Sequence, residues 1–114
     1  MRREPERLQD TLDAIARIEE YAARGRGAFD VDPLIQNWIV RHIEIIGEAC
    51  RALPPEFRAR FPAVPWKEII GMRTILVHHY FDIDTEAVWA VVENDLPPLK
   101  HSVGAILKQL ASGA

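Results

Sequence analysis

The sequence predicts an all-α protein, an up-and-down bundle of four to five helices in a single domain. Apolar residues recur at three- and four-residue spacing along most of the chain. No stretch of useful length alternates between apolar and polar residues, which argues against a sheet. At 114 residues the chain is too short for two ordinary domains, so we expect residues 1–114 to form one unit with its own core.

The first two helices are predicted from their apolar stripes and their end signals. Residues 24–27, Arg-Gly-Arg-Gly, suit the C-terminus of a first helix. Asp32 and Pro33 are residue types preferred as the N-cap and first position of a second helix, which ends at Pro54. The first stripe is Leu8, Leu12, Ile15, Ile18 and Ala22, and the second is Ile35, Ile39, Ile43, Ile46, Cys50 and Leu53.

The second helix carries more apolar surface than one packing face needs. Trp38, His42, Ile45 and Ala49 widen its stripe to an arc of roughly 160°, whereas one face requires about 100°. Gly47 is small enough to let another helix approach closely. We therefore expect this helix to pack on two sides, either inside the bundle or at the interface of a homodimer.

Further helices and one helical turn are predicted in the second half of the chain. Proline and aspartate mark several of their starts, because proline suits the first helical position and aspartate accepts bonds from free N–H groups. Pro97 and Pro98 are expected to kink or restart the chain. The segments are a turn over 55–60, a helix from Trp66 to about Val77, a helix capped by Asp84 and a last helix capped by Asp95.

Composition excludes several classes of protein. The apolar fraction of 48% is typical of a globular protein, and a net charge of −3 argues against a protein that coats nucleic acid with its whole surface. The single cysteine excludes an internal disulfide framework. No segment approaches the roughly 20 apolar residues of a transmembrane helix, and the charged N-terminus does not resemble a signal peptide. We therefore expect a cytoplasmic protein that is not bound to a membrane.

The charge is unevenly distributed along the chain. Residues 51–80 carry five basic and two acidic side chains, whereas the segments before and after are both acidic. A local anion-binding site in this middle segment is compatible with an acidic protein. Ordinary fluctuation of charge between short segments would give the same pattern.

Residues 71–84, GMRTILVHHYFDID, concentrate the side chains that could carry chemistry. The sequence lacks the motifs of phosphate loops and zinc hydrolases. Adjacent histidines on a helix point about 100° apart and chelate one ion poorly, so we expect no metal site. We also expect no cofactor. The imidazole of His78 can move protons near neutral pH, and the guanidinium of Arg73 can hold a phosphate oxygen. The pair suits metal-free cleavage of a phosphodiester.

Helical geometry limits how these two residues could cooperate. On an ideal helix Arg73 and His78 point about 140° apart, whereas Tyr80 lies within about 20° of Arg73. Either the helix distorts or ends near Val77, or the two groups converge across a dimer. The alternative is that Arg73 pairs locally and His78 is a partly buried histidine without a catalytic role.

The spacing Arg73-x4-His78-x-Tyr80 resembles the motif of HepT-type toxins, a branch of the HEPN ribonuclease superfamily. The resemblance covers most of the chain in the expected order. It includes Ile46-Gly47-Glu48-Ala49, residues 65–73, residues 80–84, and Val88-Trp89 followed by Asp95-Leu96-Pro97.

This resemblance implies an all-helical, HEPN-like homodimer that acts as a metal-independent ribonuclease toxin of a type VII toxin–antitoxin system. Arg73 would bind and polarise the scissile phosphate of RNA, and His78 would be the general acid and base. The implied partner is an MntA-like nucleotidyltransferase antitoxin, which neutralises the toxin by AMPylation of Tyr80. A higher oligomer could form in the toxin–antitoxin complex.

Two positions depart from the family pattern, and two others are candidate helpers. Thr74 follows the motif arginine where the family usually has Asn, and His79 stands where Asp is common. His79 could add a second acid or base, or lie on the surface without a role. Glu48 either points to solvent or turns toward the cleft to orient Arg73. Lys67 could steer RNA or belong to an ordinary solvated face.

A non-catalytic function is the alternative. In it, the helical dimer binds a nucleotidyltransferase or a nucleotide as an interaction module, and Tyr80 or the basic cleft is the docking site. Growth arrest on expression of the chain alone, abolished by His78→Ala, would separate the enzyme from the module.

Overall fold

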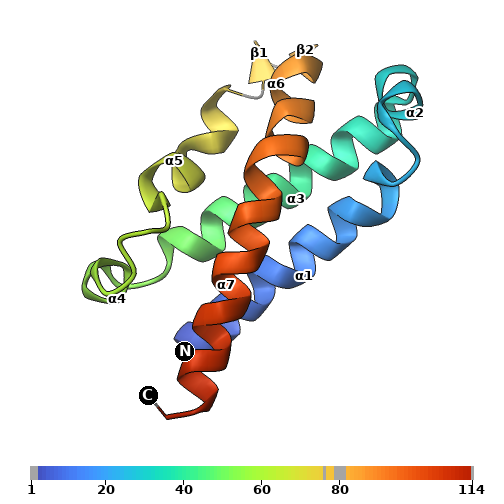
Figure 1. The fold of residues 1–114 in the computed structure, drawn as a ribbon. Helices are drawn as coiled ribbons and strands as arrows, with labels where there is room; N and C mark the ends of the chain where they lie inside the picture. The colour runs from blue at the N-terminus through green and yellow to red at the C-terminus, as the bar shows by residue number, and fades with distance from the viewer. Residues whose placement is uncertain (1–2, 76, 79–81, 114) are drawn as a thin grey trace.

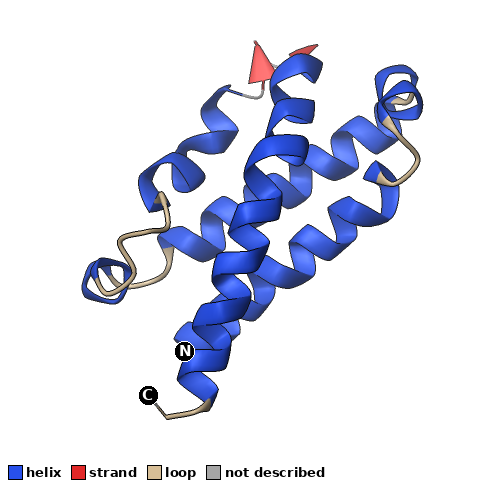
Figure 2. Ribbon diagram, in the orientation of Figure 1, coloured by secondary structure: helices blue, strands red, loops and turns tan. Residues whose placement is uncertain are grey.

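The computed structural model describes residues 3–75, 77–78 and 82–113, and of residues 73, 75, 77 and 78 it describes the backbone. Helices make up most of it (Figure 1, Figure 2). The all-α prediction is confirmed, but the count of four to five helices is not. In the described ranges the α-helices are α1 (Glu4–Ala22), α2 (Arg26–Val31), α3 (Pro33–Arg51), α4 (Pro55–Ala59), α5 (Trp66–Gly71), α6 (Thr85–Ala90) and α7 (Leu96–Ala111).

Short segments of other geometry connect these helices. A 3-10 helix, η1 (Met72–Ile75), continues α5, and a π-helical stretch, η2 (Val91–Asp95), joins α6 to α7. Strands β1 (Val77–His78) and β2 (Asp82–Ile83) pair in antiparallel fashion, with His78 opposite Asp82. This pair of two-residue strands corrects the expectation of no sheet, yet it adds no layer to the helical fold.

Helix α3 is the central element of the fold. It packs against α1 along much of its length and against α5 and η1 near its C-terminal end (Figure 1). Ile39, Ile43 and Ile46 of the predicted stripe are fully buried. The expectation that α3 packs on two sides is thus met within one chain. The outer edge of its apolar arc stays partly open, because Trp38 is 37% exposed.

Two of the three predicted caps are confirmed. The Asp32 carboxylate accepts a hydrogen bond from the Leu34 N–H (2.9 Å), and the Asp84 carboxylate accepts one from the Ala87 N–H (3.0 Å). The prediction that Asp95 caps the last helix is wrong. Its backbone is already helical, and its side chain makes no capping bond. The Leu96 N–H instead donates to the carbonyl five residues back, which carries the helix through from α6 to α7.

Helix α2 was not predicted, because its sequence, Arg-Gly-Ala-Phe-Asp-Val, has too few apolar residues for a periodic stripe. Gly25 precedes it with a φ of +92°, a backbone conformation that favours glycine. Phe29 is fully buried, with its ring centroid 5.2 Å from that of Trp89. The burial of Phe29 against Trp89, together with the Gln36 side-chain amide that donates to the Phe29 carbonyl (2.9 Å), holds this short helix in place.

Most of the large apolar side chains are gathered in one core, whereas Val31 and Leu34 are exposed at the junction of α2 and α3. Trp66 and Trp89 both belong to this core. Within the described ranges, no helix combines the length and the apolar character needed to cross a membrane.

Candidate functional site

The backbone of Arg73 lies in η1 and that of His78 in β1. The α-helical bonding of α5 stops at Gly71, and the Thr74 hydroxyl donates to the Gly71 carbonyl (2.8 Å). This confirms the expected alternative in which the helix distorts or ends near Val77. The angle of an ideal helix therefore places no limit on how the two residues are oriented.

His79 and Tyr80 lie outside the described residues. Their expected roles, a helper or surface histidine and the AMP acceptor, stay predictions. The described elements before residue 79 and after residue 81 are held in the fold. On the N-terminal side, η1 packs against α3, and on the C-terminal side, Asp84 caps α6.

Local sequence accounts for the end of α5. Gly71 is a poor helix former, and Ile75 and Val77 carry β-branched side chains that favour extended backbone. Thr74 bonds back to a carbonyl three residues earlier, which suits the tighter 3-10 turn. The result is a change from helix to strand between Arg73 and His78.

A surface depression of about 190 Å³ is lined by Thr74, the residue that follows Arg73 in the chain, and by Glu48. Both are predicted supporting residues. Glu48 belongs to α3 and Thr74 to η1, and both are exposed. The two interpretations of Glu48 therefore overlap, because its side chain is open to solvent and also borders this depression. The lining residues are Gly47, Glu48, Arg51, Ile70 and Thr74.

Gly47 explains how α3 and α5 come close enough to form the walls of this depression. A Cβ added at Gly47 would lie 3.4 Å from the Ile70 carbonyl oxygen and 3.6 Å from that of Ile69. A Cβ at this position would thus be in van der Waals contact with the α5 backbone, and side-chain atoms beyond Cβ would have to push that backbone away or enter the depression. Gly47, which the sequence predicts to allow close helix approach, therefore lies at this contact.

Four of the five basic residues of the middle segment, residues 51–80, have described side chains, and these four divide into two groups. Arg58 donates from Nε to the Leu53 carbonyl (3.2 Å), and the Arg60 guanidinium lies over the Phe61 ring, 5.2 Å from its centroid. These two arginines therefore stabilise the connection around α4. Arg51 and Lys67 are exposed, and Arg51 lines the depression whereas Lys67 does not.

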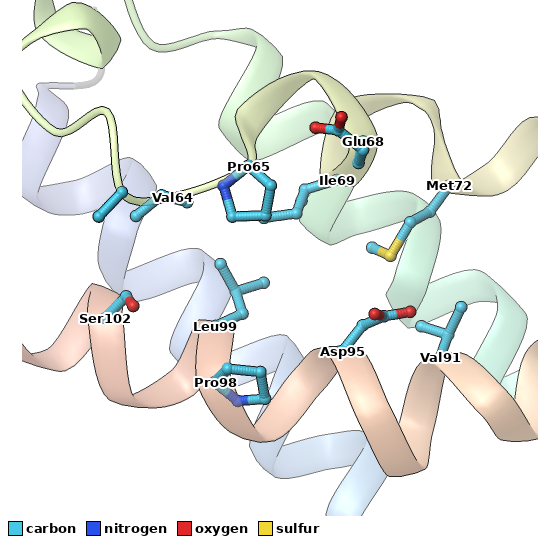
Figure 3. A pocket seen from close by; sticks show the side chains of 11 residues that line it. Val64, Pro65, Glu68, Ile69, Met72, Val91, Asp95, Pro98, Leu99 and Ser102 are labelled. Carbon is cyan, nitrogen blue, oxygen red and sulfur yellow. The ribbon is translucent and has the colours of Figure 1, made fainter.

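A second cavity, of about 240 Å³, lies between α5 with its preceding loop and the η2–α7 helix (Figure 3). Its lining is mainly apolar, with the carboxylates of Glu68 and Asp95 on opposite sides (Figure 3). Met72, the neighbour of Arg73 in the chain, is part of this lining. No sequence signal predicts this cavity, because it arises from how two distant helices pack.

Other residues that could carry chemistry have structural explanations. His42 is half-buried, with Nδ1 2.8 Å from the Trp38 carbonyl oxygen and its ring against the Trp38 ring. Burial raises the pKa of the Cys50 thiol to about 11, so it is not a nucleophile at neutral pH. Among the residues that the structure describes, no group of three His, Cys, Asp or Glu is placed to hold a metal ion.

Comparison with known proteins gives a family. The family model described as "Ribonuclease HepT-like" matches residues 11–106. "Probable ribonuclease HepT" of Thermococcus cleftensis is 38% identical over 94 residues, which cover 82% of this chain and 86% of that protein. "Gamma-glutamylcyclotransferase and putative RNase" of Methanocaldococcus jannaschii is 40% identical over 104 residues, which cover 90% of this chain and 47% of that protein.

The chain thus spans about half the length of the second of these relatives and most of the first. No solved structure gives a significant match. The family match covers the central helix α3, the depression and the change from helix to strand around Arg73 and His78. The chain belongs to the HepT-like ribonuclease family.

Proposed function

We propose that this chain is a metal-independent endoribonuclease that acts as the toxin of a type VII toxin–antitoxin system in the cytoplasm. The observation that carries the proposal is the placement of Arg73 and His78 on either side of the change from η1 to β1, in a chain of the HepT-like family. A guanidinium and an imidazole supply charge stabilisation and proton transfer, the two needs of RNA cleavage.

In the proposed reaction, His78 accepts the proton of a ribose 2′-hydroxyl as its oxygen attacks the adjacent phosphorus. Arg73 binds a non-bridging phosphate oxygen and stabilises the charge that builds there. The bond between phosphorus and the 5′-oxygen breaks, and that oxygen takes up a proton. The products are a 2′,3′-cyclic phosphate and a 5′-hydroxyl.

The proposed active form is a homodimer. Two-fold symmetry would bring the His78 side chains of both copies to one shared cleft, where one acts as base and the other as acid. Thr74, His79 and Glu48 are proposed as supporting residues, and Lys67 as a contact to the RNA backbone. The exposure of Thr74, Glu48 and Lys67 is consistent with these roles.

The proposed antitoxin is an MntA-like nucleotidyltransferase. It would transfer AMP from ATP to the Tyr80 hydroxyl, forming a bond from the phenolic oxygen to the α-phosphorus and releasing pyrophosphate. A bulky anion on this residue, two positions after His78, would block the entry of RNA.

The reaction is tested by incubating the purified chain with RNA in EDTA. We expect cleavage with cyclic-phosphate ends, and its loss in Arg73→Ala and in His78→Ala. A strict requirement for magnesium would overturn the mechanism.

The antitoxin is tested by measuring the intact mass of the chain after co-expression with an MntA-like nucleotidyltransferase from the same genome. We expect added AMP on the wild-type chain and none on Tyr80→Phe. An unmodified chain in a verified complex with an active transferase would favour inhibition by binding alone.

A further inference from the structure

The depression lined by Gly47, Glu48, Arg51, Ile70 and Thr74 has the size of a small-ligand subsite. Its volume of about 190 Å³ is below the roughly 300–1,000 Å³ of pockets for drug-sized ligands. A single nucleobase suits this space better than a longer stretch of RNA. The depression lies between α3 and the α5–η1 segment. A ligand bound in it would therefore lie near the backbone of Arg73, which is part of η1.

Hydrogen bonding within the depression restricts what it can bind. The Glu48 carboxylate can only accept hydrogen bonds when ionised. The Thr74 hydroxyl already donates its hydrogen to the Gly71 carbonyl (2.8 Å), so toward a ligand its oxygen can only accept. A ligand bound between these two side chains must therefore present donors.

Arg51, which like Glu48 lines the depression from α3, offers hydrogen-bond donors where Glu48 offers acceptors. Its exposed guanidinium can only donate, and it suits a phosphate through paired N–H groups. Arg51 follows Glu48 by three residues on one helix, so the two side chains are neighbours on its surface. Gly47, which has no side chain, and the half-buried Ile70 complete the lining with surface that a flat ring can contact.

We propose that this depression is a nucleotide subsite that selects guanine next to the scissile phosphate. Guanine presents two adjacent donors, N1–H and N2–H, which match the two oxygens of the Glu48 carboxylate. Adenine and cytosine have an amino group without a neighbouring imino N–H, and the single N3–H of uracil is flanked by two carbonyl oxygens. The phosphate of the same nucleotide would bind Arg51.

This inference rests on the proposed function, since it names the RNA feature that the enzyme selects. The first test compares cleavage of short oligoribonucleotides that differ only in the base beside the cleaved bond. We expect a guanine preference of about tenfold or more in kcat/KM, the discrimination typical of one bidentate contact. Cleavage that is equal for all four bases would overturn the subsite.

Glu48→Gln is the decisive variant, because it replaces one acceptor with a donor at nearly constant shape. The ratio of guanine to adenine cleavage should fall about tenfold. Glu56→Gln, an exposed substitution on α4 outside the depression, is the matched control and should keep the wild-type ratio. An unchanged ratio in Glu48→Gln would refute the assignment of Glu48.

Arg51→Ala tests the phosphate contact, with Arg41→Ala as an exposed control on the same helix. Loss of Arg51 should weaken binding to all RNAs and leave the base preference in place, since Arg51 contacts the phosphate. A changed base preference would contradict this division of roles. Thermal melting of each variant separates these effects from unfolding.

Nucleotide binding separates failure of the subsite from failure of the proposed function. NMR titration of the His78→Ala protein with GMP or AMP needs no cleavage. Shifts at Glu48 and Thr74 with GMP, and weaker shifts with AMP, would support the subsite even if the chain cleaves no RNA. Cleavage of RNA without any such selectivity would leave the ribonuclease in place and remove the subsite.

Discussion

Gly47 of α3 lies so close to Ile70 of α5 that an added Cβ would stand 3.4 Å from the Ile70 carbonyl oxygen. This contact positions α5, and with it the η1 segment that holds Arg73. Gly47→Leu should cost about 1–3 kcal/mol in the free energy of unfolding, because its side chain must either push against the Ile70 backbone or fill the depression that Gly47 lines. Urea unfolding measures the loss, and RNA cleavage should fall with it.

Gly104→Ala in α7 is the matched control for this substitution. A Cβ at Gly104 meets nothing within 4 Å, so the gain in helix propensity of up to about 1 kcal/mol should appear undiminished. A Gly47→Leu protein as stable as the wild type would show that the contact between α3 and α5 does not constrain the site.

Asp84 and Asp95 were both expected to cap helices, and the structure separates them. Asp84→Ala removes the acceptor of the Ala87 N–H at the start of α6, so unfolding should become easier by about 0.5–2 kcal/mol. Asp95→Ala removes an exposed side chain without a capping bond, and its effect should stay within about 0.5 kcal/mol. Equal losses in urea unfolding would contradict the assignment.

Cys50 should make the free energy of unfolding decrease as the pH rises through the alkaline range. Burial raises the pKa of its thiol to about 11 in the folded chain, whereas in the unfolded chain the thiol titrates near about 8.5. Folding therefore favours the protonated form. This contribution to the free energy of unfolding is fully present below about pH 8.5 and is lost as the pH rises toward 11. Because one unit of difference in pKa corresponds to about 1.4 kcal/mol, it amounts to a few kcal/mol.

The measurement compares urea unfolding of the wild type and Cys50→Ala between pH 7 and 10.5. The stability advantage of the wild type should shrink as the pH rises through this range. A thiol reagent at pH 8 should label Cys50 in urea and spare it in the folded protein. Rapid labelling of the folded chain would show that the thiol is accessible.

Lys67 should contribute to RNA binding through charge alone if it contacts the RNA backbone. Lys67→Ala should reduce the salt dependence of RNA affinity by about one released counterion and weaken all sequences alike. Lys108→Ala removes an exposed lysine of α7 that lies far along the chain from the site and serves as the control. Identical salt slopes for the two variants would assign Lys67 to an ordinary solvated face.

The main helices could be predicted because their signals are local. The stripe of α3, from Ile35 to Cys50, and the caps at Asp32 and Asp84 are encoded within a few residues of where they act. The prediction failed at Asp95, where the helix continues through a π-helical stretch instead of restarting. A side chain can cap a helix only if the backbone of its residue is not itself helical. The helix that precedes Asp95 continues through it and keeps its backbone helical.

The sequence by itself determined the helical class, the ends of α1 and α3, and the spacing of Arg73 and His78 that led to the family. Periodicity and spacing are properties of the amino-acid sequence, so they can be recognised without knowledge of the tertiary structure. Only the tertiary structure decided that Glu48, Arg51 and Thr74 share one depression, because that requires α3 and η1 to meet at the gap left by Gly47. Contacts between distant segments depend on packing, and no local pattern records them.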